Sequence, residues 1–361
     1  MRGIAALPGS TKPEIVELAE PSPPAPGEVL CRTLKLGICG TDREIVEAAR
    51  PLVPPGAEWL VLGHECLARV EQCGPGVDAL AEGDLVVAMI RRARADAPPL
   101  RVDLLPYGSY TERGIVEEHG FSVPHWVEPA AQLLRVDPEI ADVAVLAEPL
   151  AVAEKAANEA LILQRARLGD DAWSRRPPRV LVTGMGPIAF SGLLAAAVRG
   201  WPVTMYGLDA ADTQRAELAQ RLGATYLPAQ EANFEPADVA ADGYNLVFEC
   251  TGSEEVALRS ARALGAAGIM VWLGSRRQQH AAPAEVARLM RDGLLRNHIY
   301  LGSVNAAPRD FRDALAHLAI LRTTHVDELR GLMTHEVALD EAPWHYHNHA
   351  PQGIKIVVRY D

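Results

Sequence analysis

Three side chains that lie far apart in the chain supply the ligand types of a catalytic metal. Cys39 lies in the run Gly-Ile-Cys-Gly-Thr-Asp, His64 in Gly-His-Glu, and Glu148 in Ala-Glu-Pro-Leu. Each alone is ordinary, because buried cysteines and single histidines are common in protein cores. Together a thiolate, an imidazole and a carboxylate that leave a fourth position open are what a catalytic zinc requires. The combination predicts one zinc site.

Two residues that follow Cys39 extend this hypothesis. Asp42 can accept the free ring N–H of His64 and thereby fix the orientation of the imidazole. Thr41 carries a hydroxyl that is suited to passing on a proton from a metal-bound alcohol. We therefore expect both residues to act beside the metal.

The run Gly184-Met-Gly-Pro-Ile-Ala189 predicts a second chemical site, because it follows an apolar stretch and precedes an apolar helix. Gly184 permits a tight turn, and Gly186 lets backbone N–H groups approach a pyrophosphate. The small residue at 189 lets the helix pack near the strand. Pro187 and Ile188 begin the helix whose positive end faces the phosphates. The pattern predicts a dinucleotide site.

The next predicted strand ends in Asp209, which lies 20 residues after Ala189. A carboxylate at this place can accept hydrogen bonds from both ribose hydroxyls of NAD, and it would repel the additional phosphate of NADP. No arginine occurs within the next five positions. We therefore expect NAD rather than NADP as the cofactor.

The spacing of apolar and turn residues predicts two kinds of structure. Short apolar runs between Pro and Gly in residues 1–150 are typical of a β-rich barrel or sandwich. From about residue 150, strands alternate with helices, which predicts an α/β fold with a parallel sheet between two layers of helices. We expect strands at 179–183, 203–208, 245–249 and 268–273, helices at 150–168, 188–199, 212–222 and 254–264, helical segments after about 306, and a last strand at 354–358.

Composition excludes several classes of function. The 361 residues are 48% hydrophobic and carry a net charge of -12, which argues against nucleic-acid and membrane-surface partners. No apolar stretch approaches the ~18 residues of a membrane span, and no secretory signal is visible at the N-terminus. Five irregularly spaced cysteines fit a reducing compartment, and we expect a cytoplasmic protein. No C-x-x-C pair occurs, so a four-cysteine zinc lobe is excluded.

These motifs resemble those of the medium-chain, zinc-dependent alcohol dehydrogenase superfamily over essentially the whole chain. The match includes Val247-Phe-Glu-Cys-Thr-Gly252 in addition to the motifs above. The glucose dehydrogenase branch is the most similar. The segments that indicate this branch are Thr41–Glu44, Glu112–Ile115, His119–Phe121, Glu148–Leu150 with Glu154-Lys155, Gly302–Asn305 and Ile354-Lys355.

The resemblance implies a groES-like catalytic domain at 1–152, a Rossmann domain with a doubly wound parallel sheet at 153–305, and a segment at 306–361 that returns to the catalytic domain. It implies a zinc-dependent hydride transfer between a nicotinamide cofactor and a hydroxyl of a sugar, polyol or cyclitol. It also implies a homo-oligomer, either a dimer or a tetramer.

The resemblance assigns roles to individual residues. Zinc would be held by Cys39, His64 and Glu148, with Glu65 as an alternating or nearby ligand. Thr41, Asp42 and Glu44 would act in catalysis, with Glu44 assisting the proton relay.

The resemblance also extends the two binding sites. Glu112 and Asn305 match positions that face sugar hydroxyls or the nicotinamide, and Thr251 belongs to the cofactor site.

The chain departs from its relatives in ways that affect metal and substrate. Residues 91–111 hold no cysteine, so we expect one catalytic zinc and no structural zinc. Ile90 and Val152 stand where some sugar-oxidising relatives place polar residues, which weakens the assignment of glucose itself. Two alternatives are a zinc-free quinone or enone reductase of the same fold and a dinucleotide-binding protein without catalysis. The complete ligand set and Thr41 argue against both.

Three other features have ordinary interpretations. His345, His347 and His349 alternate in an extended pattern, which we interpret as a polar surface turn rather than a metal site. The basic run Arg91-Arg-Ala-Arg94 is interpreted as an exposed loop. Cys250 is expected to pack behind the cofactor.

Overall fold

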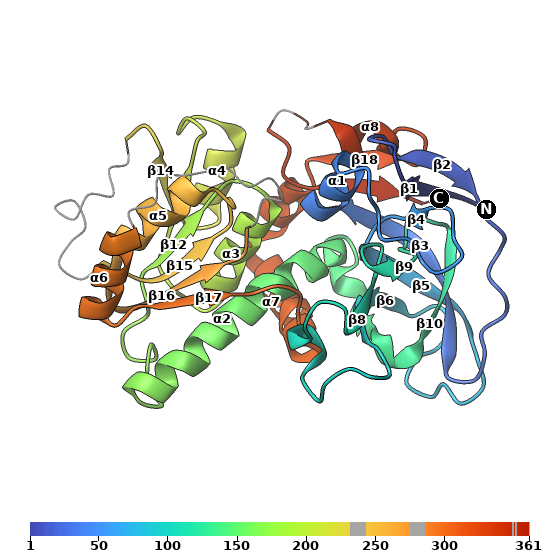
Figure 1. The fold of residues 1–361 in the computed structure, drawn as a ribbon, viewed down its shortest axis with the longest axis horizontal. Helices are drawn as coiled ribbons and strands as arrows, with labels where there is room; N and C mark the ends of the chain where they lie inside the picture. Colours follow the sequence, from blue (N-terminus) through green and yellow to red (C-terminus); the bar gives the residue numbers. More distant parts are fainter. Residues whose placement is uncertain (232–242, 275–285, 349, 351, 361) are drawn as a thin grey trace. The chain divides into compact units, whose positions relative to one another are not determined.

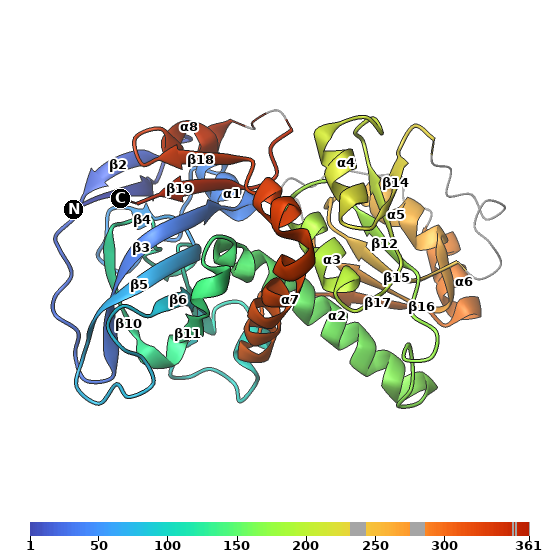
Figure 2. The ribbon, with the colours of Figure 1, turned by 180° about the vertical axis from the view of Figure 1, so that it is seen from behind.

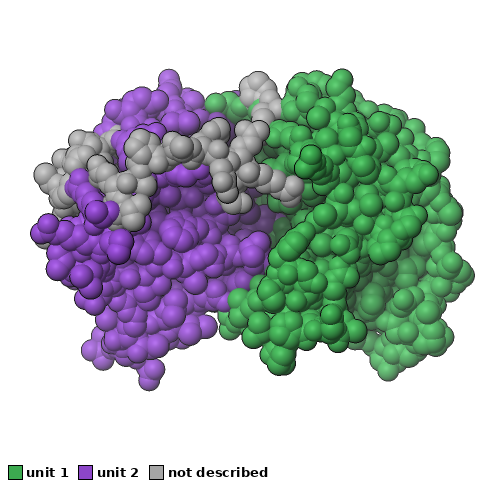
Figure 3. Space-filling model, viewed as in Figure 1, with its two compact units in different colours: residues 1–148, 307–322, 333–361 green, residues 149–306, 323–332 purple. Residues whose placement is uncertain are grey.

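The computed structural model describes residues 1–231, 243–274, 286–348, 350 and 352–360. The chain forms two compact units, which Figure 3 shows in green and purple. Unit 1 consists of Met1–Glu148, Ala307–Arg322 and Met333–Asp361, and unit 2 of Pro149–Ala306 and Thr323–Leu332. The segment 306–361, which was expected to return to the catalytic domain, is divided between the units, because residues 323–332 belong to unit 2.

Unit 1 is built around a mainly antiparallel sheet with the strand order β11-β6-β5-β3-β19-β18, in which β10 also pairs with β3 and only the β18–β19 pair is parallel (Figure 1). Two small sheets have the orders β2-β1-β4 and β7-β8-β9. The strands are β1 (Arg2–Ala6), β2 (Glu14–Glu17), β3 (Glu28–Ile38), β4 (Leu60–Val61), β5 (Glu65–Cys73), β6 (Leu85–Ala88), β7 (Arg91–Ala93), β8 (Tyr110–Arg113), β9 (Glu117–Glu118), β10 (His125–Pro129), β11 (Leu133–Val136), β18 (His335–Ala338) and β19 (Ile356–Arg359).

The helices that lie wholly within unit 1 are short. They are α1 (Gly40–Glu47), α8 (Ala342–His347) and the 3₁₀ turns Val102–Leu104, Ala130–Gln132, Pro138–Ile140 and Ala144–Leu146. The long helix α7 (Pro308–Leu332) has non-helical backbone angles at His325, close to the residue where its assignment changes from unit 1 to unit 2. The core of unit 1 is apolar and includes Leu36, Ile38, Phe121 and Trp126.

Unit 2 is a sheet of six parallel strands in the order β14-β13-β12-β15-β16-β17, with helices beside it (Figure 2). The strands are β12 (Val180–Thr183), β13 (Val203–Gly207), β14 (Thr225–Pro228), β15 (Tyr244–Glu249), β16 (Leu264–Trp272) and β17 (Ile299–Gly302). The helices are α2 (Ala147–Leu168), α3 (Pro187–Ala197), α4 (Gln214–Arg221), α5 (Glu254–Arg262) and α6 (Val286–Arg296). The predicted α/β architecture is confirmed.

The order of the parallel strands places a topological switch point between β12 and β15. The chain moves from β12 outward through β13 and β14, and it then returns to the other side of β12. Ligands of open α/β sheets bind at the carboxyl ends of the strands at such a point. Gly184 and Cys250 directly follow these two strands. Within the described ranges, no helix has the length and apolar character that crossing a membrane requires.

Glycines let the loop after β8 pack directly on the segment that precedes His64. Gly114 has φ +72°, and a Cβ there would lie 2.7 Å from the carbonyl oxygen of Gly63. A Cβ on Gly120 would lie 2.3 Å from the same oxygen. The amide of Phe121 donates to Gly63 O at 2.9 Å. Only glycines permit this backbone-to-backbone contact, which fixes the position from which His64 projects.

We predict that Gly114→Ala destabilises the protein more than Gly108→Ala. Both positions have positive φ, so both variants suffer the same kind of backbone strain. A Cβ at Gly108 meets nothing within 4 Å, whereas one at Gly114 collides with Gly63. The difference in free energy of unfolding, measured with urea, should be roughly 1–3 kcal/mol. Equal losses in the two variants would show that the contact with Gly63 is unimportant.

Candidate functional site

Cys39, His64 and Glu65 form a cluster of potential metal ligands in unit 1. Their ligand atoms all lie within 4.8 Å of one another, and no other such group of three occurs in the described part of the chain. Cys39 is the residue that caps α1, and His64 directly precedes β5. His64 and Glu65 are buried, and Cys39 is partly buried. The structure thus brings together Cys39 and His64, which are two of the three predicted ligands, and Glu65, which was predicted as an alternating or nearby ligand.

The carboxylate of Asp42 holds both ligand-bearing segments. Asp42 is fully buried, and its Oδ2 accepts a hydrogen bond from the backbone N–H of Cys39 at 2.9 Å. Its Oδ1 accepts one from the backbone N–H of Gly63 at 3.3 Å. Nδ1 of His64 lies 3.3 Å from the same Oδ1. Asp42 therefore lies beside His64, and it also contacts the backbone of both ligand-bearing segments, while the hydrogen bond from the His64 ring stays a prediction.

The pKa of His64 reflects the negative charge around this cluster. Burial by itself would lower the pKa of His64, but the charges of Asp42 and Cys39 outweigh burial and raise this pKa well above its ordinary value. His64 Nδ1 is a buried nitrogen without a hydrogen-bond partner among the described groups. A negative, buried donor set of sulfur, nitrogen and oxygen fits a divalent cation such as zinc.

Glu148 stands at the start of α2 and is not part of the 4.8 Å cluster. It is close enough to interact electrostatically with the cluster. Burial raises the pKa of Glu148 to about 7, against the opposing charge of His64. The charges of Glu65 and Glu112 raise it further. The structure therefore places the third predicted ligand beside the cluster rather than within it.

The carboxylate of Glu65 is held by a lysine that the sequence analysis noted only as a mark of resemblance. Lys355 Nζ donates to both oxygens of Glu65, at 2.7 Å to Oε1, and both side chains are 1% exposed. A Cβ on Gly37, which pairs with Glu65 across β3 and β5, would lie 2.1 Å from Glu65 Oε2. Glycine at 37 therefore makes room for the carboxylate, and Lys355 neutralises it.

The two other predicted catalytic residues lie on α1. Thr41 and Glu44 are both partly buried, and Thr41 belongs to the first turn, next to Asp42. Their short distance in sequence from Cys39 keeps them in unit 1 near the cluster.

Glu112, the predicted substrate residue, is buried on β8 in an ion pair. Arg91 Nε donates to Glu112 Oε1 at 2.8 Å, and the side chains are 3% and 7% exposed. The interpretation of Arg91 to Arg94 as an exposed loop is therefore wrong. These residues form strand β7 and its end, and each arginine pairs with a carboxylate far away in the sequence.

In unit 2, the predicted glycine turn joins β12 to α3. Gly184 has φ +103°, which favours glycine, and Gly186 caps the helix that begins with Pro187 and Ile188. A Cβ on Gly186 would meet no atom within 4 Å, so open space lies above this residue. The N–H groups at the start of an 11-residue helix thus face a space that can receive a phosphate.

The turn after β15 is organised by Glu249, which the sequence analysis missed. Its Oε1 accepts from the backbone N–H of Thr251 at 2.9 Å and from the hydroxyl of Thr183 at 3.2 Å. Its Oε2 accepts from the N–H of Gly252 at 3.2 Å. This buried carboxylate fixes predicted cofactor residue Thr251 next to the glycine turn, where a Cβ on Gly184 would lie 3.3 Å from Thr251. Burial raises the pKa of the adjacent Cys250 thiol.

The reason given for NAD over NADP does not hold in the structure. Asp209 forms a two-pronged ion pair with Arg215, at 2.7 Å from Nε to Oδ2 and 2.6 Å from the terminal nitrogen to Oδ1. Arg215 lies six positions after Asp209, just beyond the five positions that hold no arginine. The guanidinium of Arg215 therefore lies beside Asp209, where the sequence predicted a carboxylate without a nearby cation.

Asn305 is buried, 7% exposed, and has φ +61°. It ends the segment that follows β17, and Lys155 Nζ donates to the preceding carbonyl of Val304 at 2.8 Å. The structure thus holds this predicted cofactor and substrate residue in a constrained backbone conformation in unit 2.

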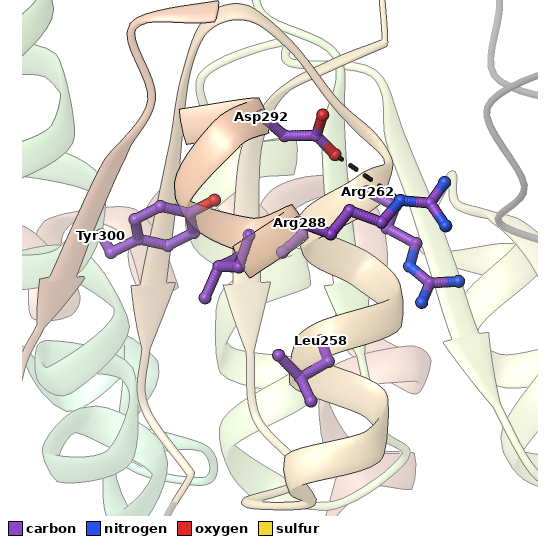
Figure 4. Close-up of a pocket in the computed structure, with 7 residues that line it drawn as sticks. Leu258, Arg262, Arg288, Asp292 and Tyr300 are labelled. Carbon is purple, nitrogen blue, oxygen red and sulfur yellow. Dashed lines mark ion pairs between the residues drawn. The ribbon is translucent and has the colours of Figure 1, made fainter. Parts of the chain in front are cut away.

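The histidine run is helical rather than extended. His345 and His347 lie at the end of α8, so they do not alternate on one side of a strand, and His349 lies outside the described residues. A separate pocket of unit 2 lies between α5, α6 and β17 (Figure 4). It is lined by residues that include Leu258, Arg262 and Tyr300, and it contains none of the predicted site residues.

Comparison with known proteins agrees with this arrangement. Residues 25–125 match the family model of the alcohol dehydrogenase GroES-like domain, and residues 141–360 match that of the glucose dehydrogenase C-terminus. Glucose 1-dehydrogenase 1 of Caldivirga maquilingensis is 35% identical over 342 residues, which is 94% of this chain and 93% of the relative. Glucose 1-dehydrogenase of Thermoproteus tenax is 37% identical over 323 residues, 88% of each chain.

A solved structure is similar over the whole chain. The glucose dehydrogenase of Haloferax mediterranei, in complex with NADP, Zn and gluconolactone, superposes with a TM-score of 0.86 at 28% identity. The match covers 100% of this chain and 99% of that one. Galactitol-1-phosphate dehydrogenase of Escherichia coli, with a TM-score of 0.82 at 17% identity, shows the same fold.

We predict that Asp42→Asn weakens zinc binding about 10- to 100-fold. An amide offers only one oxygen, so it cannot accept hydrogen bonds from both Cys39 and Gly63, and the two ligand-bearing segments lose their common anchor. Competition with a chromophoric chelator measures the affinity. Asp142→Asn, which removes an ion pair with Arg322 at 2.9 Å elsewhere in unit 1, is the control. Unchanged affinity in Asp42→Asn would contradict this role.

Proposed function

The chain belongs to the zinc-dependent medium-chain dehydrogenases, in the glucose dehydrogenase-like branch, and from this premise we propose that it oxidises a hydroxyl of a sugar or polyol. D-Glucose is the first candidate substrate, and a nicotinamide dinucleotide is the hydride acceptor. The observation that carries the proposal is the buried cluster of Cys39, His64 and Glu65 with Glu148 beside it. The relatives named glucose 1-dehydrogenase and the gluconolactone in the Haloferax complex support the substrate class.

We propose that Cys39, His64 and Glu148 hold the zinc, with Glu65 kept nearby by Lys355. When bound, zinc would supply a Lewis acid for the substrate hydroxyl, and the dinucleotide would supply the acceptor for hydride. The donor set supports zinc because sulfur, nitrogen and oxygen ligands are its usual partners. Asp42 keeps Cys39 and His64 in place.

Thr41 is proposed to take the proton of the substrate hydroxyl while its own proton passes toward solvent, with Glu44 assisting. The substrate carbon loses hydride to the nicotinamide, so the C–OH group becomes C=O and two electrons leave with the hydride. A hemiacetal hydroxyl would give a lactone in this way. Glu112 and Asn305 are proposed to bind further substrate hydroxyls. Ile90, which is 3% exposed, supplies no such partner, so a panel of aldoses, polyols and cyclitols is needed to identify the substrate.

We further propose a homo-oligomer in the cytoplasm. The five cysteines are all free, which supports a reducing compartment. Analytical ultracentrifugation of the full chain tests the oligomeric state.

We predict that Cys39→Ser loses zinc and that its turnover of D-glucose falls at least ~10³-fold, since a metal Lewis acid contributes several kcal/mol. Binding of NADH or NADPH, followed by fluorescence, should be retained, because Gly184, Gly186 and Asp209 belong to unit 2. Cys73→Ser, at a partly exposed thiol of unit 1, is the matched control and should keep zinc and turnover. Full turnover by Cys39→Ser in the presence of a chelator would contradict the zinc proposal.

For the cofactor, we propose that NAD and NADP both bind and that Asp209 and Arg215 set their ratio. Asp209 can accept hydrogen bonds from ribose hydroxyls, and the guanidinium of Arg215 can pair with the additional phosphate of NADP. Their mutual ion pair lets either group face the ribose end. The NADP in the Haloferax complex supports the inclusion of NADP.

We predict opposite changes in cofactor preference for the two variants. Arg215→Met should lower kcat/KM with NADP about 10-fold relative to NAD, because it removes a charged hydrogen bond. Asp209→Asn should shift the ratio toward NADP, because it removes a negative charge. The control is Arg221→Met, which lies on the same helix α4 as Arg215 and removes an ion pair with Glu328 of α7. A ratio that is the same in all four proteins would refute this assignment.

A further inference from the structure

Arg91 is a buried cation that is fixed from three sides. Its Nε donates to Glu112 Oε1 at 2.8 Å, and a terminal nitrogen donates to the carbonyl oxygen of Asp103 at 3.3 Å. The centre of its guanidinium lies 3.9 Å from the ring centroid of Tyr110. The side chain is only 3% exposed. A guanidinium that is stacked, ion-paired and hydrogen-bonded at once has little rotational freedom.

This fixed cation determines where the carboxylate of Glu112 lies. Arg91 on β7 and Glu112 on β8 are directly opposite one another in the antiparallel pair. Side chains of such a pair project from the same face of the sheet. The orientation of the carboxylate therefore follows from an arginine that cannot turn away without losing Tyr110 and Asp103.

Glu112 lies close to the proposed metal site. The segment that follows it packs on the backbone of Gly63 through Gly114 and Gly120. This backbone contact holds the segment that carries Glu112 against the residue that precedes His64, a proposed zinc ligand.

The other two arginines of the run have different partners. Arg92 pairs with Glu128, and Arg94 pairs with Glu117 at 2.6 Å in a partly exposed ion pair. Arg91 is therefore the member of the run that contacts the proposed substrate residue.

We propose that Arg91 is a positioning residue for substrate specificity, which holds Glu112 as a hydrogen-bond acceptor toward the hydroxyl groups of a sugar or polyol. This inference rests on the proposed function. An ionised carboxylate only accepts hydrogen bonds, so it selects substrates that present O–H donors at this place. A substrate that lacks the donor forgoes the hydrogen bond to Glu112 and binds less tightly.

The experiment is a double-mutant cycle with D-glucose as the probe. KM and kcat are measured at saturating NADP for the wild-type protein, Arg91→Met, Glu112→Gln and the double variant. Zinc content and the urea unfolding midpoint are recorded for each. Arg94→Met, which removes the partly exposed ion pair with Glu117, is the matched control. Arg91→Lys keeps the positive charge but lacks the planar guanidinium with its several fixed N–H donors. It provides a second test if Arg91→Met does not fold.

Arg91→Met should raise KM for D-glucose about 10-fold, because the hydrogen bond to a charged group is lost. We expect kcat and zinc content of Arg91→Met to stay within about twofold of wild type. The KM of Arg91→Lys should lie between those of the wild-type protein and Arg91→Met. When position 112 is already Gln, the further change Arg91→Met should raise KM for D-glucose by less than about twofold, because the effects of coupled residues are not additive.

The inference is wrong if Arg91→Met leaves KM unchanged, or if it raises KM equally with Glu and with Gln at position 112. The latter result would mean that Arg91 has only a general structural role. Failure of the proposed function gives a different result, namely no turnover of D-glucose or of any member of the panel of aldoses, polyols and cyclitols by the wild-type protein with either cofactor, and this result would remove the inference as well.

Discussion

The buried carboxylate of Asp42 is the constraint on which the proposed metal site depends. Cys39 and His64 come from segments that are 25 residues apart, and neither segment is held at its ligand by a regular ladder alone. One carboxylate accepts from the backbone of Cys39 through Oδ2 and from that of Gly63 through Oδ1. A buried charge is costly unless it is fully hydrogen-bonded, so these contacts both satisfy Asp42 and set the separation of the ligands.

The other buried carboxylates around this centre are matched by cations from distant parts of the chain. Lys355 neutralises Glu65, and Arg91 neutralises Glu112. Removing one member of such a pair leaves an uncompensated buried charge, which costs far more than the pair contributes. Glu148 is the contrasting case, because burial raises its pKa to about 7. A divalent cation would stabilise its ionised form, which makes the donor set and the metal mutually dependent.

The sequence predicts the centre of unit 2 well and its edges poorly. β12, β13, β15 and β16 are found near their expected positions, because central strands of a parallel sheet are continuous apolar runs. β14 and β17 were missed. They are the two edge strands, they are partly exposed, and they lack such a run. The glycine turn was recognisable because it needs residues of a particular type at fixed spacing.

Contacts of the site escaped prediction where the two partners are distant in sequence. Glu65 and Lys355 are 290 positions apart, and no local pattern connects them. Arg91 stands in a basic run that is typical of an exposed loop, and its burial depends on Glu112, 21 positions away. Arg215 is closer, but it pairs with Asp209 only because the turn at 210–213 brings the start of α4 back to the end of β13.

The segment between β7 and β8 is held by Arg91, the same arginine that orients Glu112. Residues 91–111 contain no cysteine, so they cannot be held by a cysteine-bound metal. Asp103 is 2% exposed and accepts from Arg101 through both carboxylate oxygens, while its carbonyl accepts from Arg91. The arginine that orients Glu112 therefore also fastens this segment. Because the same guanidinium makes both contacts, substitutions that loosen the segment should change recognition of the substrate even when they lie far from the metal ligands.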